Sequence, residues 1–89
     1  MKRSVFSIEL HRARDAEESY AIRLAGEQSW RSRIGFGSQF EKVWNVEFQP
    51  AMEVDLELLD WDPVLDRAIE AFRMSDPIVT NFEATQGVS

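Results

Sequence analysis

The chain has 89 residues, of which 44% are hydrophobic and 11% aromatic, and it contains no cysteine. These values exclude a disulfide-stabilised or thiolate–metal protein and predict one small folded domain rather than a disordered chain. The net charge is −6, because eight basic and six acidic side chains in residues 1–44 are followed by two basic and ten acidic ones in residues 45–89. An acidic protein repels nucleic acid and anionic membranes, so we expect direct binding to neither unless the basic first half acts alone.

The sequence contains no apolar run near the roughly 20 residues that a membrane-spanning helix needs. Its first residues, MKRSVFSIELHRA, alternate apolar and polar side chains, whereas a signal peptide needs a continuous apolar stretch. We therefore predict a cytoplasmic protein without membrane contact, which the absence of cysteine also favours.

The first predicted strand contains Phe6, Ile8 and Leu10, which alternate with polar side chains. His11 falls on the polar side of this alternation, so its imidazole is predicted to be solvated rather than catalytic. The charged segment of residues 12–19 has no apolar residue larger than alanine and is predicted to be a loop.

Two alternating segments with a glycine between them predict a β-hairpin. A turn at Gly26–Gln28 would place Leu24 opposite Trp30 and Tyr20 opposite Ile34. The larger side chains of both segments would then share one face of the sheet.

A helix over residues 15–25 is the competing interpretation of the same segment. Asp15 and Glu18 have the spacing of a capping box, and Gly26 stands where a helix C-terminus is often capped. The apolar residues would spread around most of the circumference of this helix, so the hairpin is preferred.

The hairpin register has a consequence for charge. Arg23 would face Arg31 across the two strands, with Arg33 beside them, and like charges directly opposite each other destabilise a sheet. Either the acids of residues 52–58 lie next to these arginines in the same sheet, or the arginines form a basic patch for an anionic partner.

Ser38 and Glu41 again have capping-box spacing and predict one helical turn. A strand follows over residues 44–48, in which alternate residues are apolar, and it ends at Pro50. Trp44 in this strand, like the tryptophan of the hairpin, occupies a predicted core position.

The next predicted strand covers residues 52–58, where apolar and acidic side chains alternate without exception. Its inward-facing residues are Met52, Val54, Leu56 and Leu58, and its outward-facing residues are Glu53, Asp55 and Glu57. A helix is disfavoured here, because Asp55 would fall in the middle of the apolar arc.

The clearest helix signal is Asp62 with Pro63, a preferred N-cap followed by a residue suited to the first turn. It predicts a helix over about residues 63–75, which ends before Asp76–Pro77. The apolar stripe of this helix consists of Val64, Leu65, Ala68, Ile69 and Phe72.

A short last strand is predicted from Ile78, Val79 and Phe82, and residues 84–89 are predicted to be a frayed tail. The strands do not alternate regularly with helices, which indicates the α+β class. We therefore predict a single domain over residues 1–83, with a mostly antiparallel sheet of about four to six strands and one main helix packed on one face.

The sequence offers little for catalysis. It has one histidine, and it contains no nucleophile elbow, phosphate-binding loop or zinc-ligand spacing. Gly35–Phe36–Gly37 lacks the third glycine of a dinucleotide motif, and the acids do not have the spacing of a calcium loop. We predict neither an enzyme nor a cofactor or metal site.

The acidic second half is the best candidate for a binding surface. Alternate strand residues stand about 6.5–7 Å apart and every fourth helix residue rises about 6 Å, so the two rows would come within about twofold of the charge density of DNA. The candidate partner-binding residues are Glu53, Asp55, Glu57, Asp60, Trp61, Asp62, Asp66 and Glu70. We predict an inhibitor that uses them to bind a basic surface of another protein, such as a nucleic-acid-binding surface, in the manner of small viral proteins that act against host defence.

Two other interpretations stay open. The acids can be a solvated surface and nothing more, because acidic side chains are common on the outer side of strands and in the first turn of helices. The protein can also be an assembly subunit or adaptor that associates, also with itself, through strand edges and exposed aromatic residues. Trp61 is expected to pack against the start of the helix, and it would be a binding anchor only if exposed.

Overall fold

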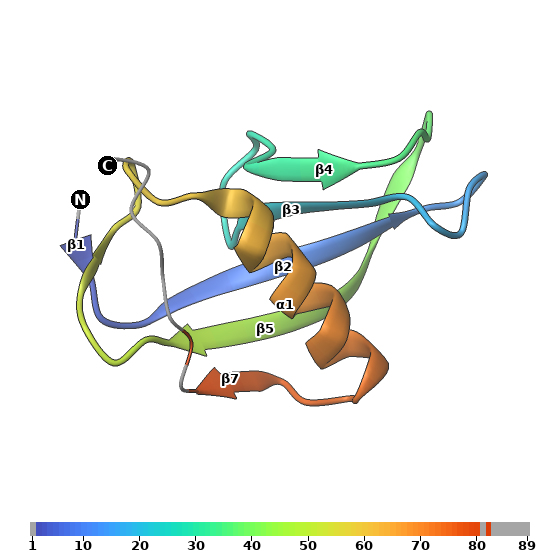
Figure 1. Ribbon diagram of the computed structural model, residues 1–89. Coiled ribbons are helices and arrows are strands. Elements are labelled where there is room, and N and C mark those ends of the chain that lie inside the picture. The colour runs from blue at the N-terminus through green and yellow to red at the C-terminus, as the bar shows by residue number, and fades with distance from the viewer. Residues whose placement is uncertain (1, 81, 83–89) are drawn as a thin grey trace.

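The computed structural model describes residues 2–80 and residue 82, and its helix lies across a β-sheet (Figure 1). In chain order the elements are β1 (Lys2–Arg3), β2 (Phe6–Ala13), β3 (Tyr20–Leu24), β4 (Ser32–Ile34), β5 (Phe40–Gln49), β6 (Val54–Asp55), α1 (Trp61–Arg73) and β7 (Ile78–Thr80). The main sheet has five strands in the order β4-β3-β2-β5-β7, and β1 pairs with β6 in a separate two-stranded sheet. All pairs are antiparallel except β5 with β7. The predicted α+β fold is confirmed.

The core lies between α1 and the face of the sheet beneath it (Figure 1). Val64 and Leu65 on the helix are completely buried, and so is Phe48 on the interior strand β5. Burial of each such side chain contributes roughly 1.5–3 kcal/mol, so this layer is the main source of stability. The predicted apolar stripe is confirmed, with half-buried Phe72 at its end, where the ring centroids of Phe72 and Trp44 lie 5.8 Å apart.

α1 begins at Trp61, before the predicted start at residue 63, because Asp60 rather than Asp62 is its N-cap. The Asp60 carboxylate accepts a hydrogen bond of 3.3 Å from the Asp62 N–H. Either aspartate is chemically suited to cap a helix, so residue type alone could not distinguish them. The helix ends at Arg73, whose charge complements the negative end of the helix dipole.

β3 and β4 form the predicted hairpin, with Tyr20 opposite Ile34. The competing helix is therefore wrong. β4 begins only at Ser32, so the predicted pairing of Leu24 with Trp30 does not form. Trp30 lies instead in the loop between the strands, where its side chain is free to fold over another part of the sheet.

Residues 40–43 belong to strand β5, so the helical turn predicted there is wrong. Both residues of the supposed capping box have partners far away in the sequence. Ser38 Oγ donates a hydrogen bond of 2.7 Å to Asp15 Oδ2, and Arg14 Nε donates one of 3.1 Å to Glu41 Oε2. The hydroxyl and N–H of Ser38 hold the pKa of Asp15 below its ordinary value.

Most of the strand predicted over residues 52–58 is wrong, because the chain is in a strand only in β6 and turns directly after it. Val54 and Leu56 are buried as predicted. Met52 and Leu58, which the same alternation places in the core, are 79% and 45% exposed. A period-two pattern thus marks burial correctly only as far as the backbone remains extended.

β7 is the predicted last strand, and it lies parallel to β5 at the edge of the sheet. Phe82, just beyond it, is buried, with its ring centroid 5.1 Å from that of Phe48. The predicted tail, residues 84–89, lies outside the described residues. Within the part of the chain that the structure describes, no helix is long and apolar enough to cross a membrane.

Candidate functional site

A hollow of about 580 Å³ lies between α1 and the β3–β4 hairpin, and we call it the acidic groove. Its buried lining residues are Tyr20 and Ile69. Its exposed apolar lining residues are Ile34 and Met74, with 43% and 69% of their surfaces accessible. Exposed apolar side chains beside a hollow of this size are typical of a binding site.

Charged side chains complete the lining of the acidic groove: the carboxylates of Glu18, Asp66 and Glu70 and the guanidinium of Arg73. Arg73 Nη2 lies 3.9 Å from Glu18 Oε2, which makes a weak, exposed ion pair. Asp66 and Glu70 stand about one helical turn apart. Neither forms an ion pair with any residue that the structure describes. The groove is therefore apolar inside and carries uncompensated negative charge at its rim.

The two aspartates at the start of α1 have roles in the fold. Asp60 caps the helix, and Asp62 Oδ1 accepts a hydrogen bond of 2.7 Å from Ser32 Oγ on β4. This bond connects the edge strand to the helix, and so connects the two sides of the acidic groove. Both carboxylates are nevertheless exposed, so they extend the negative potential of the helix toward its N-terminus.

Glu53, Asp55 and Glu57 lie apart from the acidic groove. Glu57 lines a second hollow of about 430 Å³ together with Arg31, and the linings of the two hollows have no residue in common. Asp55 Oδ1 accepts a hydrogen bond of 3.0 Å from the Glu57 N–H, and this bond and the charge of Lys2 hold the pKa of Asp55 below its ordinary value. Glu53 is exposed and lines neither hollow. Asp66 and Glu70 thus line the acidic groove, whereas Glu53, Asp55 and Glu57 lie elsewhere.

Trp61 packs against the core. Its half-buried ring meets the ring of Phe6 edge-on, with 6.0 Å between the centroids. The Arg31 guanidinium lies 5.4 Å from the centroid of the Trp61 ring. These contacts favour the packing role of Trp61 over that of a free binding anchor.

The arginines of the hairpin have acidic partners that sequence patterns did not identify. Arg23 Nε lies 2.9 Å from Glu9 Oε1, and Arg31 Nη2 lies 2.7 Å from Glu27 Oε1. The acids around β6 do not lie beside these arginines in the same sheet, because β6 belongs to the other sheet. Arg33 has no ion pair within the described residues, so only part of the predicted basic patch is neutralised.

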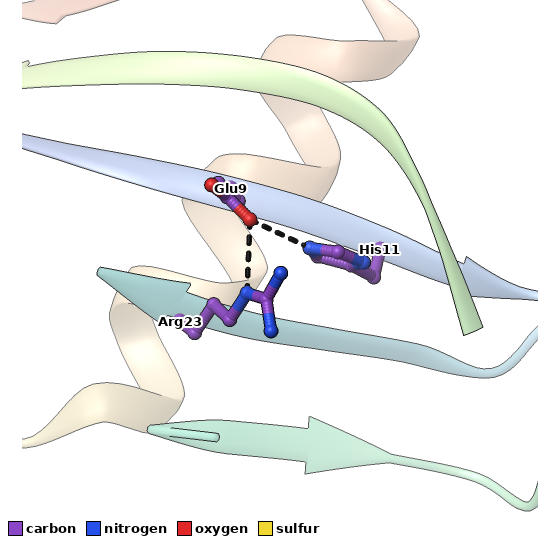
Figure 2. Close-up of polar contacts among 3 residues, drawn as sticks. All are labelled: Glu9, His11 and Arg23. Atoms are coloured by element: carbon purple, nitrogen blue, oxygen red, sulfur yellow. Dashed lines mark hydrogen bonds and ion pairs between the residues drawn. The ribbon is translucent and has the colours of Figure 1, made fainter. Parts of the chain in front are cut away.

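Figure 2 shows Glu9 and His11 on β2 and Arg23 on β3, with the Glu9 carboxylate in contact with both other side chains. His11 Nε2 lies 3.0 Å from Glu9 Oε1, the same oxygen that accepts from Arg23. Burial alone would raise the pKa of Glu9, but the hydrogen bonds from His11 and Arg23 and the charges of Arg23 and Lys42 outweigh burial and lower it. Because ionised Glu9 only accepts, His11 Nε2 must carry the proton of this bond. His11 is 6% exposed, so its predicted solvated position is wrong.

The face of the sheet that carries Glu9 also carries a row of residues paired across four strands. The row consists of Arg33 on β4, Ala21 on β3, His11 on β2 and Lys42 on β5. Ala21 is fully buried, whereas Arg33 and Lys42 at the two ends are exposed. The row therefore has a small, covered middle and a cation at each end.

Trp30 covers the middle of this row, although the sequence predicts it in the core. Its ring centroid lies 4.9 Å from that of His11 and 5.7 Å from that of Phe40. The Arg23 guanidinium lies 5.2 Å from the Trp30 centroid, and the Arg33 guanidinium lies 6.0 Å from the Phe40 centroid. Trp30 is still 39% exposed. We call Arg23, Trp30, Arg33, Phe40 and Lys42 the aromatic–basic surface.

The sequence did not indicate that several residues of these two surfaces would belong to a candidate site. Glu18 belongs to a segment predicted to be a charged loop, or in the competing interpretation the start of a helix, and Met74 follows the last helical turn. The hairpin register did place Tyr20 and Ile34 on one face, which was a usable signal for the groove. Nothing in the local pattern indicated that Trp30 would leave its strand.

No group of three or more His, Asp or Glu side chains within residues 2–80 and 82 could hold a metal ion. The acidic groove and the aromatic–basic surface are the two candidate functional sites. No family model, curated protein or solved structure matches this chain.

Proposed function

We propose that the protein is a non-enzymatic binding protein and that its acidic groove holds a basic, amphipathic segment of a partner protein. One observation supports this most: Ile34 and Met74 are exposed beside the same hollow whose rim carries the unpaired carboxylates of Asp66 and Glu70. Apolar contacts supply most of the affinity at such sites, whereas charge complementarity raises the association rate and selects the partner.

The partner segment would place apolar side chains in the groove and Lys or Arg beside its rim. Basic surfaces of this kind are common on nucleic-acid-binding proteins, whose Lys and Arg side chains neutralise phosphates. Covering such a surface would inhibit the partner, and cytoplasmic inhibition is the form of the function that we favour. Exposed Asp60 and Asp62 would add longer-range attraction along the helix.

The test uses two charge-reversed variants as baits for proteins from the cells that naturally contain the chain. Asp66→Lys/Glu70→Lys reverses the rim of the groove, and Glu53→Lys/Glu57→Lys makes the same change of charge at exposed positions outside it. We expect a partner that binds the wild type and the control, is lost from the rim variant, and is released by high salt. Equal retention by the two variants would contradict the proposal, provided that their melting curves show both to be folded.

Photo-crosslinking gives a second, independent readout. A photoreactive residue at Met74, in the groove, is expected to crosslink the partner, whereas one at Met52, which is also highly exposed, is not. Crosslinking from Met52 but not from Met74 would place the partner on the wrong side of the molecule for this proposal.

A second function, that of an assembly subunit or adaptor, is favoured by Phe36. Its side chain is 91% exposed, and it lies two residues after the end of the edge strand β4. Exposed strand edges and aromatic residues favour self-association. Light scattering distinguishes the functions, since assembly predicts a dimer or larger species that resists salt and is lost in Phe36→Ser. A monomer at all concentrations would exclude self-assembly.

A further inference from the structure

An acidic surface and a basic surface of this protein lie on opposite sides of the main sheet. The acidic groove lies on the helix side of the sheet, whereas the aromatic–basic surface lies on the side that Figure 2 views. We propose that the aromatic–basic surface binds single-stranded nucleic acid, with a base stacked on Trp30 and with phosphates beside Arg33 and Lys42. This site goes beyond the proposed function and uses none of the residues of the groove.

The local charge of this surface is positive although the whole protein is negative. Its cations are Arg23, Arg33 and Lys42, and within the described residues only Arg23 forms an ion pair, with Glu9, whose carboxylate also interacts with the charge of Lys42. Charges act over about 8 Å at physiological ionic strength. The acids of the groove lie on the helix side of the main sheet, so a ligand on the opposite face meets the three cations first. The net charge, which argues against nucleic-acid binding, is thus the wrong quantity for this face.

Trp30 is held in a position suited to stacking. Its ring contacts His11 and Phe40, and the Arg23 guanidinium lies 5.2 Å from its centroid, yet 39% of its surface is exposed. An indole fixed by these contacts loses little conformational freedom when a base stacks on it. Base–aromatic stacking tolerates any sequence, because every base has a π-face.

The two cations of this surface that form no ion pair within the described residues come from opposite ends of one row across the sheet. Arg33 and Lys42 end the row across β4, β3, β2 and β5, so their Cα atoms stand three strand spacings, or roughly 14 Å, apart. The Arg33 guanidinium reaches toward β5, where it lies 6.0 Å from the centroid of the Phe40 ring. A strand that crosses the sheet can place successive phosphates near each of them while a base between them covers Trp30.

The test titrates the full chain into a short fluorescently labelled oligothymidylate at several salt concentrations and follows the anisotropy. Arg33→Gln/Lys42→Gln is expected to lower the slope of log affinity against log salt by about 1.4, because each phosphate contact on a single strand contributes about 0.7. The matched control, Lys2→Gln/Arg67→Gln, removes the same charge from exposed positions elsewhere and is expected to keep the slope.

Trp30 is tested by a pair of variants. Trp30→Leu is expected to weaken binding roughly tenfold or more, and Trp30→Phe, which retains a ring, to restore most of the loss. The proposal is overturned if the wild type binds at none of the salt concentrations, or if the control loses as much affinity as Arg33→Gln/Lys42→Gln. Competition by thymidine monophosphate as effective as by the oligonucleotide would also overturn it, because the site would then belong to a free nucleotide.

Discussion

Arg23 and Glu9 stand directly opposite each other on β3 and β2, and their side chains meet at 2.9 Å. The Glu9 side chain is only 14% exposed, whereas both partners of the surface pair Arg14–Glu41 are about half exposed or more. Water therefore screens the first pair much less than the second. Removing one member of a poorly solvated pair leaves the other with its desolvation cost unmatched.

We expect Glu9→Gln to lower the free energy of unfolding by about 2 kcal/mol, the usual scale for losing hydrogen bonds to a charged group in such surroundings. Glu41→Gln, which removes the exposed pair, should cost less than about 1 kcal/mol. Urea unfolding of both variants measures the difference. Equal costs would mean that the Glu9 pair is as well solvated as the surface pair.

The same carboxylate predicts a pH dependence. The pKa of Glu9 is lower in the folded protein than its ordinary value of 4.5, which applies to the unfolded chain. As the pH falls, the unfolded chain binds the proton first, so the stabilisation by Glu9 is complete above about pH 4.5 and is lost as the pH falls through the folded-state pKa. Between neutral pH and about pH 3 the wild type should lose more stability than Glu9→Gln. Parallel curves for the two proteins would contradict the assignment.

Leu56 and Leu58 test the correction to the predicted strand. Leu56 is 4% exposed and Leu58 is 45% exposed. Leu56→Ala is expected to cost roughly 2–5 kcal/mol through lost burial and a residual cavity, and Leu58→Ala less than about 1 kcal/mol. A continuous strand would make both changes costly, so similar losses in thermal or urea unfolding would favour the strand.

Gly35 and Gly26 both have a positive φ, of 77° and 87°, but only one of them is crowded. A Cβ at Gly35 would lie 3.0 Å from Ser19 Cα, whereas a Cβ at Gly26 would have no neighbour within 4 Å. Gly26→Ala should therefore show only the backbone cost of roughly 1–2 kcal/mol, and Gly35→Ala that cost plus roughly 1–3 kcal/mol of overpacking. Melting temperatures measured side by side decide this, and equal shifts would show that the loop at Gly35 yields easily.

Local periodicity identified much of the fold because the residues concerned are buried on one side only. Side-chain alternation predicts the first strand and the register of Tyr20 with Ile34. Helical spacing predicts the apolar stripe of α1 that includes Val64 and Leu65. In each case the signal lies within a few residues of the feature that it predicts. The predicted start of α1 was wrong because Asp60 and Asp62 are equally suited to cap a helix, and a local signal cannot distinguish them.

What could not be predicted depends on contacts between distant segments. His11 is buried because Trp30, from a loop 19 positions later, folds over it. Ser38 has the spacing of a cap but donates to Asp15 in another loop, which leaves residues 40–43 free to extend β5. The acidic groove likewise exists only because α1 lies beside the hairpin, so its rim could be suspected from charge but its apolar lining could not be assembled.

The parallel pairing of β7 with β5 also has a consequence for synthesis of the protein. β5 already carries Phe48 when it is made, but the neighbour on its open edge, Ile78–Thr80, follows only after all of α1. β5 leaves the ribosome before β7, so a nascent chain presents an unpaired apolar strand edge until the helix and β7 have followed it. In that interval a chaperone, or a second nascent chain on the same messenger, has access to a surface that the finished protein hides.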